Sequence, residues 1–183
     1  MTKKLISACL ALCLCLSLFT GCGSKVDEFV TADNVNQSSV NVAEGFFQAI
    51  FTGDRELFNA CYPASFKEYE NDDGETVDME EVFFEYSTYL DPDLTYVGAS
   101  LSGYNDYDED HGYTDFPNLA EDIAALHHTT SDMILQAQIV KLRLNFDDAD
   151  GSRLTTDVYI LVYKTDSAWY VFELQNSDAE FAV

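Results

Sequence analysis

Apolar residues recur with helical spacing in the first half of the chain. Between residues 43 and 51 they fall at positions i, i+3, i+4, i+7 and i+8, which places them on one face of an amphipathic helix. Gly53 is expected to end this helix, and Asp54 is expected to cap a second, shorter helix that ends before Pro63. A third helix is expected to begin at Asp78, after a turn-rich loop. The first half of the chain therefore predicts helices with apolar faces to bury.

An alternation of apolar and polar residues replaces the helical spacing in the second half of the chain. Strands are expected over residues 94–101, 133–146 and 154–162, with a final strand that begins at Trp169. A short helix is expected over residues 117–128, between the first two strands. Helices followed by antiparallel strands indicate an α+β fold, in which the helices pack on one face of a curved sheet.

The first 21 residues have the composition of a secretory signal peptide. Two lysines near the start precede an uncharged apolar run, and small residues follow that run. The run is too short to span a bilayer comfortably. We therefore expect residues 1–21 to be removed, residues 22–39 to form a flexible tether, and residues 40–183 to form one domain.

The cysteine that follows the apolar run has a specific sequence context. Residues 19–22 read "FTGC", which resembles the lipobox of bacterial lipoproteins. The resemblance implies that Cys22 carries a lipid and anchors the domain to the outer face of a bacterial cell membrane, since acyl chains bind a bilayer firmly. The alternative is an ordinary signal peptide with an incidental cysteine. Once residues 1–21 are removed, only Cys22 and Cys61 remain, so a framework of several disulfides is excluded.

The chain is strongly acidic, with a formal net charge of −24. Without residues 1–21, which hold two lysines and no acid, 7 basic and 33 acidic residues remain, a net charge of −26. This charge argues against nucleic acid and anionic lipid headgroups as partners, because both are polyanions. It is compatible with a basic protein partner or a cation, and equally with a surface that only keeps an exported protein in solution.

Two segments carry a resemblance to a known family. "VAEGFFQAIFTGDRELFNACYP" (42–63) resembles the opening helices of the NTF2-like superfamily, and "YILVYKTDSAWYVFEL" (159–174) resembles its closing hairpin. The two segments are especially similar to those of small NTF2-like lipoproteins of Gram-positive bacteria. The resemblance implies a cone with a cavity between the sheet and the helices. Some members of the superfamily are isomerases or dehydratases that place Asp, His and Tyr in the cone, and many others only bind or associate.

Two glutamines are candidates to line such a cavity. Gln136 and Gln138 share the alternation of the apolar residues at 140, 142, 144 and 146, so both amides are expected on the core side, together with Tyr96 of the first strand. A bulge would instead turn residues 135, 137 and 139 inward, and the start of the strand could also extend beyond the core. The pocket-lining prediction therefore depends on an uninterrupted strand.

Three further side chains with reactive chemistry are expected to be structural. His127 and His128 end the predicted helix 117–128, where a protonated imidazole suits the negative end of the helix dipole. We expect a capping role at the surface; the alternative is acid–base catalysis with a partner carboxylate. Cys61 lies on the apolar stripe of the second helix and is expected to be buried as a small apolar residue.

A calcium site is the one metal site that the sequence raises. Asp106, Asp108 and Asp110 have the spacing of the first three ligands of a calcium-binding loop. His111 stands where that loop requires glycine, and Pro117 stands where it requires a bidentate carboxylate. Ser-His-Asp spacing, HExxH, CxxC and a glycine-rich phosphate loop are all missing from the sequence. We therefore expect no metal and no cofactor.

These observations favour a lipid-anchored, extracytoplasmic binding or interaction module without catalytic activity. It would bind a small ligand in the cone or a protein on its surface. The alternative is an isomerase- or dehydratase-type enzyme that uses a polar residue in the cone. An open cavity enclosing an Asp or a His beside a Tyr would favour the enzyme.

Overall fold

The computed structural model of the chain describes residues 30–70, 76–88, 91 and 93–175. The predicted signal peptide, Cys22 and the first part of the predicted tether lie outside the described residues. Within the described residues, no helix is both long and apolar enough to cross a membrane. The elements, in chain order, are η1 (Val35–Gln37), α2 (Ser39–Thr52), α3 (Arg55–Ala60), β1 (Glu68–Glu70), β2 (Thr76–Asp78), α4 (Met79–Thr88), β3 (Thr95–Asp106), η2 (Glu109–His111), α5 (Phe116–Leu126), η3 (Ser131–Met133), β4 (Gln136–Asp147), β5 (Arg153–Lys164) and β6 (Trp169–Gln175).

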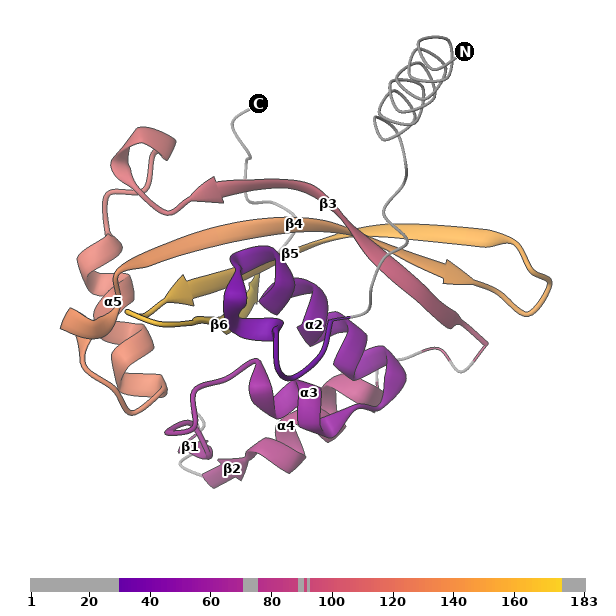
Figure 1. Cartoon of the computed structure of the whole chain (residues 1–183), viewed down its shortest axis with the longest axis horizontal. Coiled ribbons are helices and arrows are strands. Elements are labelled where there is room, and N and C mark those ends of the chain that lie inside the picture. Colours follow the sequence, from indigo (N-terminus) through magenta and orange to yellow (C-terminus); the bar gives the residue numbers. More distant parts are fainter. Residues whose placement is uncertain (1–29, 71–75, 89–90, 92, 176–183) are drawn as a thin grey trace, which may run out of the picture.

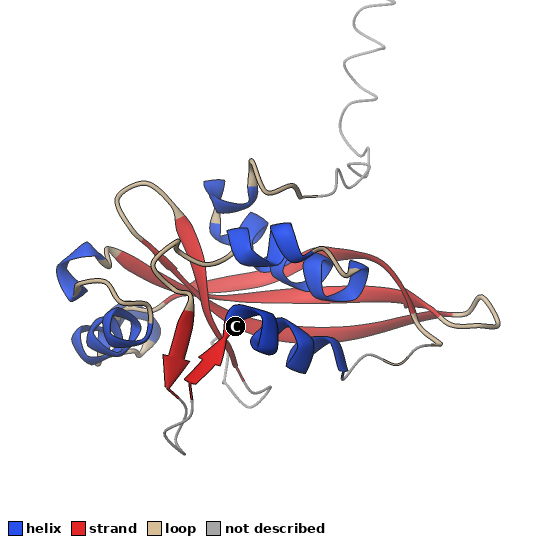
Figure 2. Cartoon of the chain, turned by 90° about the horizontal axis from the view of Figure 1, so that it is seen from below, coloured by secondary structure: helices blue, strands red, loops and turns tan. Residues whose placement is uncertain are grey.

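The predicted α+β fold is confirmed. Four long or medium strands form an antiparallel sheet in the order β3-β4-β5-β6, and α2 crosses one of its faces. Figure 1 shows α2, α3 and α4 together on one side of the sheet, while α5 lies at one end. In Figure 2, which is viewed from the helix side, helices lie across the middle of the sheet and α5 remains apart at the same end. Helices thus cover the middle of one face, and the other face only at the α5 end.

Strand alternation divides the core into two clusters. Val140, Leu142 and Leu144 are buried against α2, α3 and α4, as their shared phase predicts. Residues of the opposite phase, such as Ile139 and Leu161, are buried in a second cluster with α5. The larger cluster is rich in aromatic rings that contact one another from α2, α3 and α4, and its central members are Phe46, Phe58, Tyr62, Phe83 and Tyr86. This packing fills the space between the helices and the middle of the sheet.

The helix boundaries follow local chemistry. Gly53 ends α2 with a left-handed φ of 74°, which glycine adopts without steric cost. Asp54 caps α3 as predicted, because its carboxylate accepts the backbone N–H of Leu57. Asp78 likewise accepts the backbone N–H groups of Glu80 and Glu81 at the start of α4. The short antiparallel pair β1–β2, which precedes α4, was not predicted.

The predicted tether over residues 22–39 is wrong for its second half. Val35 is completely buried and Val30 nearly so, and both pack in the larger cluster. The Gln48 side chain fixes this segment by accepting the Val30 backbone N–H and donating to the Val30 carbonyl. Residues 30–38 therefore belong to the packed domain. The polar composition of this segment gave no indication that Val30 and Val35 would be buried.

Candidate functional site

An apolar pocket opens between the helices and the sheet, beside α2 and α4. Its volume is about 570 Å³. Residues from α2, α4, β4, β5 and β6 surround it, together with two residues of the connection before β3. The lining residues are Phe47, Ile50, Phe51, Tyr86, Asp91, Leu94, Phe146, Thr156 and Leu174.

The chemistry of this pocket suits a hydrocarbon or aromatic ligand. Aromatic rings and aliphatic side chains make up most of its lining, so a ligand would gain from leaving water rather than from many polar contacts. Asp91 is the one carboxylate in the lining, and it accepts the backbone N–H of Asp93. Phe51 is held in place by Phe146, whose ring centroid lies 4.8 Å away. The walls are therefore formed by packed elements of the fold.

Tyr96 stands behind the pocket wall. Its ring stacks on Phe51 with centroids 5.2 Å apart and planes 14° apart, and it also contacts Phe146. The tyrosine is not among the residues that line the pocket. Tyr96 was predicted to line a cavity; it instead supports Phe51, which does.

Gln136 and Gln138 lie at the other end of β4 from Tyr96, so the three predicted pocket residues are not brought together. Gln138 is buried on the helix-bearing face, as its phase predicts. Both amides donate to one carboxylate oxygen of Asp106, at 2.7 Å from Gln136 and 2.6 Å from Gln138. The Oε1 atom of Gln138 is buried without a partner in the part of the chain that the structure describes. Their role is to fix Asp106 at the end of β3.

A second pocket, of about 500 Å³, lies at this end of the sheet. Its ionisable lining residues other than tyrosine are all acidic, namely Asp106, Asp108 and Glu109. The rings of Tyr107 and Tyr113 stack within it with centroids 4.2 Å apart. We call this region the acidic pocket; Gln136 lines it, and Gln138 does not.

The three aspartates of the calcium candidate are engaged differently from one another. Asp106 accepts the two glutamine amides, and Asp108 caps η2 and lies 2.7 Å from the imidazole Nδ1 of His111. This contact with His111 lowers the pKa of Asp108 and raises that of His111. Asp110 is exposed. Among residues 30–70, 76–88, 91 and 93–175, no group of three or more His, Cys, Asp or Glu side chains is arranged to hold a metal ion.

The expected surface position of His127 is wrong. The side chain is fully buried, and its Nδ1 lies 2.6 Å from the hydroxyl oxygen of Tyr163. Burial, together with the charge of neighbouring His128, lowers the pKa of His127 to about 3, so the imidazole is neutral. The chain at Phe66 folds over the end of α5 and stacks on the imidazole at 4.5 Å, which the sequence of the helix alone did not reveal. His128, in contrast, is exposed, as expected.

Neither this histidine nor Cys61 is placed for catalysis at a described pocket. A His beside a Tyr was the pair expected for the isomerase or dehydratase alternative. His127 and Tyr163 form such a pair, but neither residue lines the apolar or the acidic pocket. Cys61 is buried, as predicted, and burial raises the pKa of its thiol far above the usual range. His127 and Cys61 are thus part of the packed interior.

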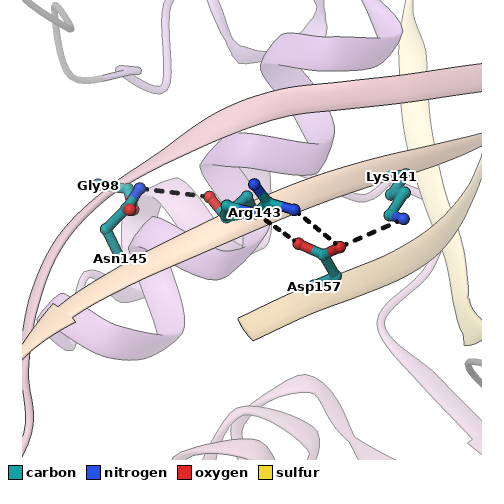
Figure 3. Close-up of polar contacts among 5 residues, drawn as sticks. All are labelled: Gly98, Lys141, Arg143, Asn145 and Asp157. Atoms are coloured by element: carbon teal, nitrogen blue, oxygen red, sulfur yellow. Dashed lines mark hydrogen bonds and ion pairs between the residues drawn. The ribbon is translucent and has the colours of Figure 1, made fainter. Parts of the chain in front are cut away.

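The uncovered face of the sheet carries a compact ion-pair cluster (Figure 3). The Asp157 carboxylate on β5 accepts two hydrogen bonds from Arg143 on the neighbouring strand and lies 3.2 Å from Lys141 Nζ. Lys141 also lies over the ring of Tyr159. The partners are partly exposed to solvent, which screens their attraction, so the cluster contributes little net stability. The cluster links strands β4 and β5. Its charges largely offset one another, whereas the acidic pocket presents an excess of negative charge.

Comparison of the chain with protein-family models, with curated proteins and with solved structures gives no match.

Proposed function

We propose that this protein is a lipid-anchored, extracytoplasmic binding module with an NTF2-like domain, and that it holds an apolar small molecule in the pocket between α2, α4 and the sheet. The observation that carries the proposal is the pocket itself. Its volume of about 570 Å³ lies in the range typical of small-molecule sites, and its lining is predominantly apolar. The "FTGC" segment supports the anchor, and the helices on one face of an antiparallel sheet support the family.

The lining of the pocket favours binding over catalysis. An isomerase or dehydratase needs an acid or base in contact with its substrate, with a pKa suited to proton transfer. The histidine that could fill this role, His127, is enclosed elsewhere, between Phe66 and Tyr163. The one carboxylate in the lining, Asp91, is exposed and accepts the backbone N–H of Asp93, so it caps a turn at the rim of the pocket. The apolar pocket instead offers surfaces that release water when a ligand enters, which is a driving force for affinity alone.

A filling substitution on β5 tests this proposal. Thr156 lines the pocket, whereas adjacent Thr155 lies on the opposite face of the same strand, and both are exposed. Thr156→Trp should fill the pocket with an indole ring, and Thr155→Trp provides a matched control for the effect of a tryptophan on this strand. The protein used is residues 22–183 with Cys22→Ser, which keeps every residue that the structure describes and carries no lipid.

The measurement is a fluorescence titration with the neutral apolar dye N-phenylnaphthylamine. We expect saturable binding that Thr156→Trp weakens by at least about tenfold, equivalent to about 1.4 kcal/mol, and that Thr155→Trp leaves unchanged. Absence of saturable binding to the unsubstituted protein would contradict the proposal. Equal weakening by the two tryptophans would contradict it too, because the dye would then bind elsewhere.

A further inference from the structure

The two edge strands of the sheet, β6 and β3, differ in how their outer backbone edges are covered. On the β6 side, the Cys61 carbonyl accepts the backbone N–H of Val171, and the Asn36 side chain donates to the Trp169 carbonyl. These contacts cover the outer edge of β6. On the other side, β3 pairs only with β4 in the part of the chain that the structure describes, and Figure 1 shows β3 at the outer margin of the sheet. β3 therefore offers the backbone edge to which another strand can be added.

Apolar side chains stand exposed along this open edge. Leu101 pairs with Leu142 and Tyr104 pairs with Val140, so both lie on the helix-bearing face of the sheet. Their β4 partners are buried, whereas Leu101 is 45% exposed and Tyr104 is 54% exposed. At these positions the helices cover the side chains of β4 and leave Leu101 and Tyr104 of β3 exposed. An added strand would place side chains of its own beside these two residues.

The acidic pocket continues this edge. Asp106, which ends β3, lies on the same face as Leu101 and Tyr104 and is oriented by the amides of Gln136 and Gln138. The pocket beyond it adds further carboxylates and the stacked rings of two tyrosines. Aromatic faces and carboxylates together suit an ammonium or guanidinium group. Exposed apolar positions thus lead directly to a site for a positive charge.

From this arrangement we propose that the edge of β3 binds an extended basic segment of another protein as an added antiparallel or parallel strand. The segment alternates apolar and basic residues. Its apolar side chains contact Leu101 and Tyr104, and a lysine or arginine, which the alternation places on the opposite face, enters the acidic pocket beside Tyr107. Backbone hydrogen bonds to β3 supply affinity, and the pocket supplies specificity for positive charge. This surface is separate from the apolar pocket, so the inference goes beyond the proposed function.

Charge selects a basic partner over a second copy of this chain. The expected mature chain carries a net charge of −26, and the carboxylates of the acidic pocket lie at the end of the edge in question. Two copies would bring like charges together, which opposes association, whereas a basic segment gains attraction at long range. The attraction is screened by salt, so the affinity for a basic segment should fall as ionic strength rises.

The test uses a seven-residue peptide of alternating lysine and valine, blocked at both ends and labelled with a fluorophore. Fluorescence anisotropy measures its binding to residues 22–183 carrying Cys22→Ser. Leu101→Lys should weaken binding by at least about tenfold, because it places a charge on the open edge. Leu154→Lys is the matched control. Leu154 is also 45% exposed, but it is the second residue of β5, which is not an edge strand.

Two further comparisons separate backbone pairing from charge. A peptide with N-methyl groups on alternate amides, chosen in both phases, should bind at least about tenfold more weakly in one phase, because one edge of the peptide loses its donors. Glu109→Lys, in the acidic pocket, should weaken binding more than Glu121→Lys, on the exposed side of α5. A peptide of alternating glutamate and valine should show no binding at the same concentrations.

The outcomes that overturn the proposal are distinct from those of the dye titration. Equal binding of the unmethylated peptide and of both methylated peptides would show charge attraction without strand addition. Equal binding to the Leu101→Lys and Leu154→Lys variants would place the contact elsewhere. A stable dimer in light scattering that Leu101→Lys dissociates would assign the edge to a second copy. None of these results depends on whether the apolar pocket binds N-phenylnaphthylamine.

Discussion

The Nδ1 atom of His127 lies 2.6 Å from the hydroxyl oxygen of Tyr163, where the end of α5 meets β5. Both side chains are completely buried, and the Nε2 atom of His127 has no partner among the described residues. The imidazole also contacts the rings of Phe66 and Phe172, which approach it from two different segments. The polar contact thus joins the end of α5 to β5, and two aromatic rings from other segments enclose it.

Removal of both partners of this contact should cost less than the sum of the two single removals. His127→Phe leaves the buried Tyr163 hydroxyl without this partner, and Tyr163→Phe leaves the imidazole without it. Each change should lower the free energy of unfolding by about 1–3 kcal/mol. The double variant should lose less than the sum, since the interior is then apolar on both sides. Urea unfolding of the four proteins measures the coupling, and strict additivity would contradict a pairwise contact.

The burial of neutral His127 predicts a loss of stability in acid. Its pKa is about 3 in the folded protein and about 6.5 in an unfolded chain, so the unfolded state binds the proton first as the pH falls. The contribution of this group is complete above pH 6.5 and declines from there toward pH 3. Between pH 7.5 and pH 4 the loss should be about 3 kcal/mol.

The His127→Phe variant isolates this effect from the many carboxylates. Those groups titrate similarly in both proteins, so the difference in unfolding free energy between wild type and variant should shrink or reverse as the pH falls. A difference that is constant from pH 7.5 to pH 4 would mean that the imidazole is not held neutral in the folded state.

Gly45 tests whether residues 30–38 belong to the domain. A Cβ atom at this position would lie 2.5 Å from Cγ2 of Val35 and 3.3 Å from Cγ1 of Val30. Gly45→Ala gains about 0.5–1 kcal/mol of helix propensity, but the overlap should cost about 1–3 kcal/mol, so the net effect is destabilising. Adding Val35→Ala makes room for the new methyl group and should offset part of that cost. Gly103→Ala, where no heavy atom lies within 4 Å, is the control.

The unfolding free energies of these variants, measured in urea, decide the point. If Gly45→Ala is as harmless as Gly103→Ala, the segment before α2 is not packed on the helix in solution. A cost for Gly45→Ala that Val35→Ala does not reduce would mean that a different neighbour of Gly45 is displaced.

Local periodicity was sufficient to predict the longer elements but not the β1–β2 pair, because α2, α3 and the long strands each show a spacing that one buried face imposes. The phase of β4 was also correct: Val140 and Leu142 face the helices, and Lys141 and Arg143 face away. Periodicity cannot say which distant segment covers a face. The spacing therefore predicted the helix α5 but not the face of the sheet against which it packs.

The errors at the candidate sites have the same cause. His127 continues the apolar stripe of α5 four residues after Ile123, but its polar ring favoured a surface position; residues near Phe66 cover it only in the folded chain. Gln136 does line a pocket, the acidic one, but Gln138 lines neither, and the apolar pocket lies at the opposite end of β4. Val30 and Val35 were isolated apolar residues in a polar stretch, and the small residue Gly45, against which Val35 packs, was the available signal.

Calcium is predicted not to stabilise the protein. Asp106 already accepts two glutamine amides, and Asp108 already accepts donors from His111, so a metal would have to replace these contacts. The melting temperature should be the same in millimolar calcium chloride as in equimolar magnesium chloride, which controls for ionic strength. An increase seen with calcium alone, and abolished by Asp108→Asn, would instead establish a calcium site in this segment.

The anchor proposed at Cys22 makes a prediction that is independent of the fold. Two or three acyl chains on this residue would bind the bilayer at about 0.8 kcal/mol for each buried methylene, which is far more than a soluble acidic domain gains from a membrane surface. In bacterial cells labelled with radioactive palmitate, the wild-type protein should be labelled and should sediment with membranes. Cys22→Ser should be unlabelled and should appear in the soluble fraction.

Cys61→Ser is the matched control. The Cys61 thiol is buried in the domain, so its substitution should leave both labelling and sedimentation unchanged. Labelled, membrane-bound Cys22→Ser protein would show that another residue carries the lipid.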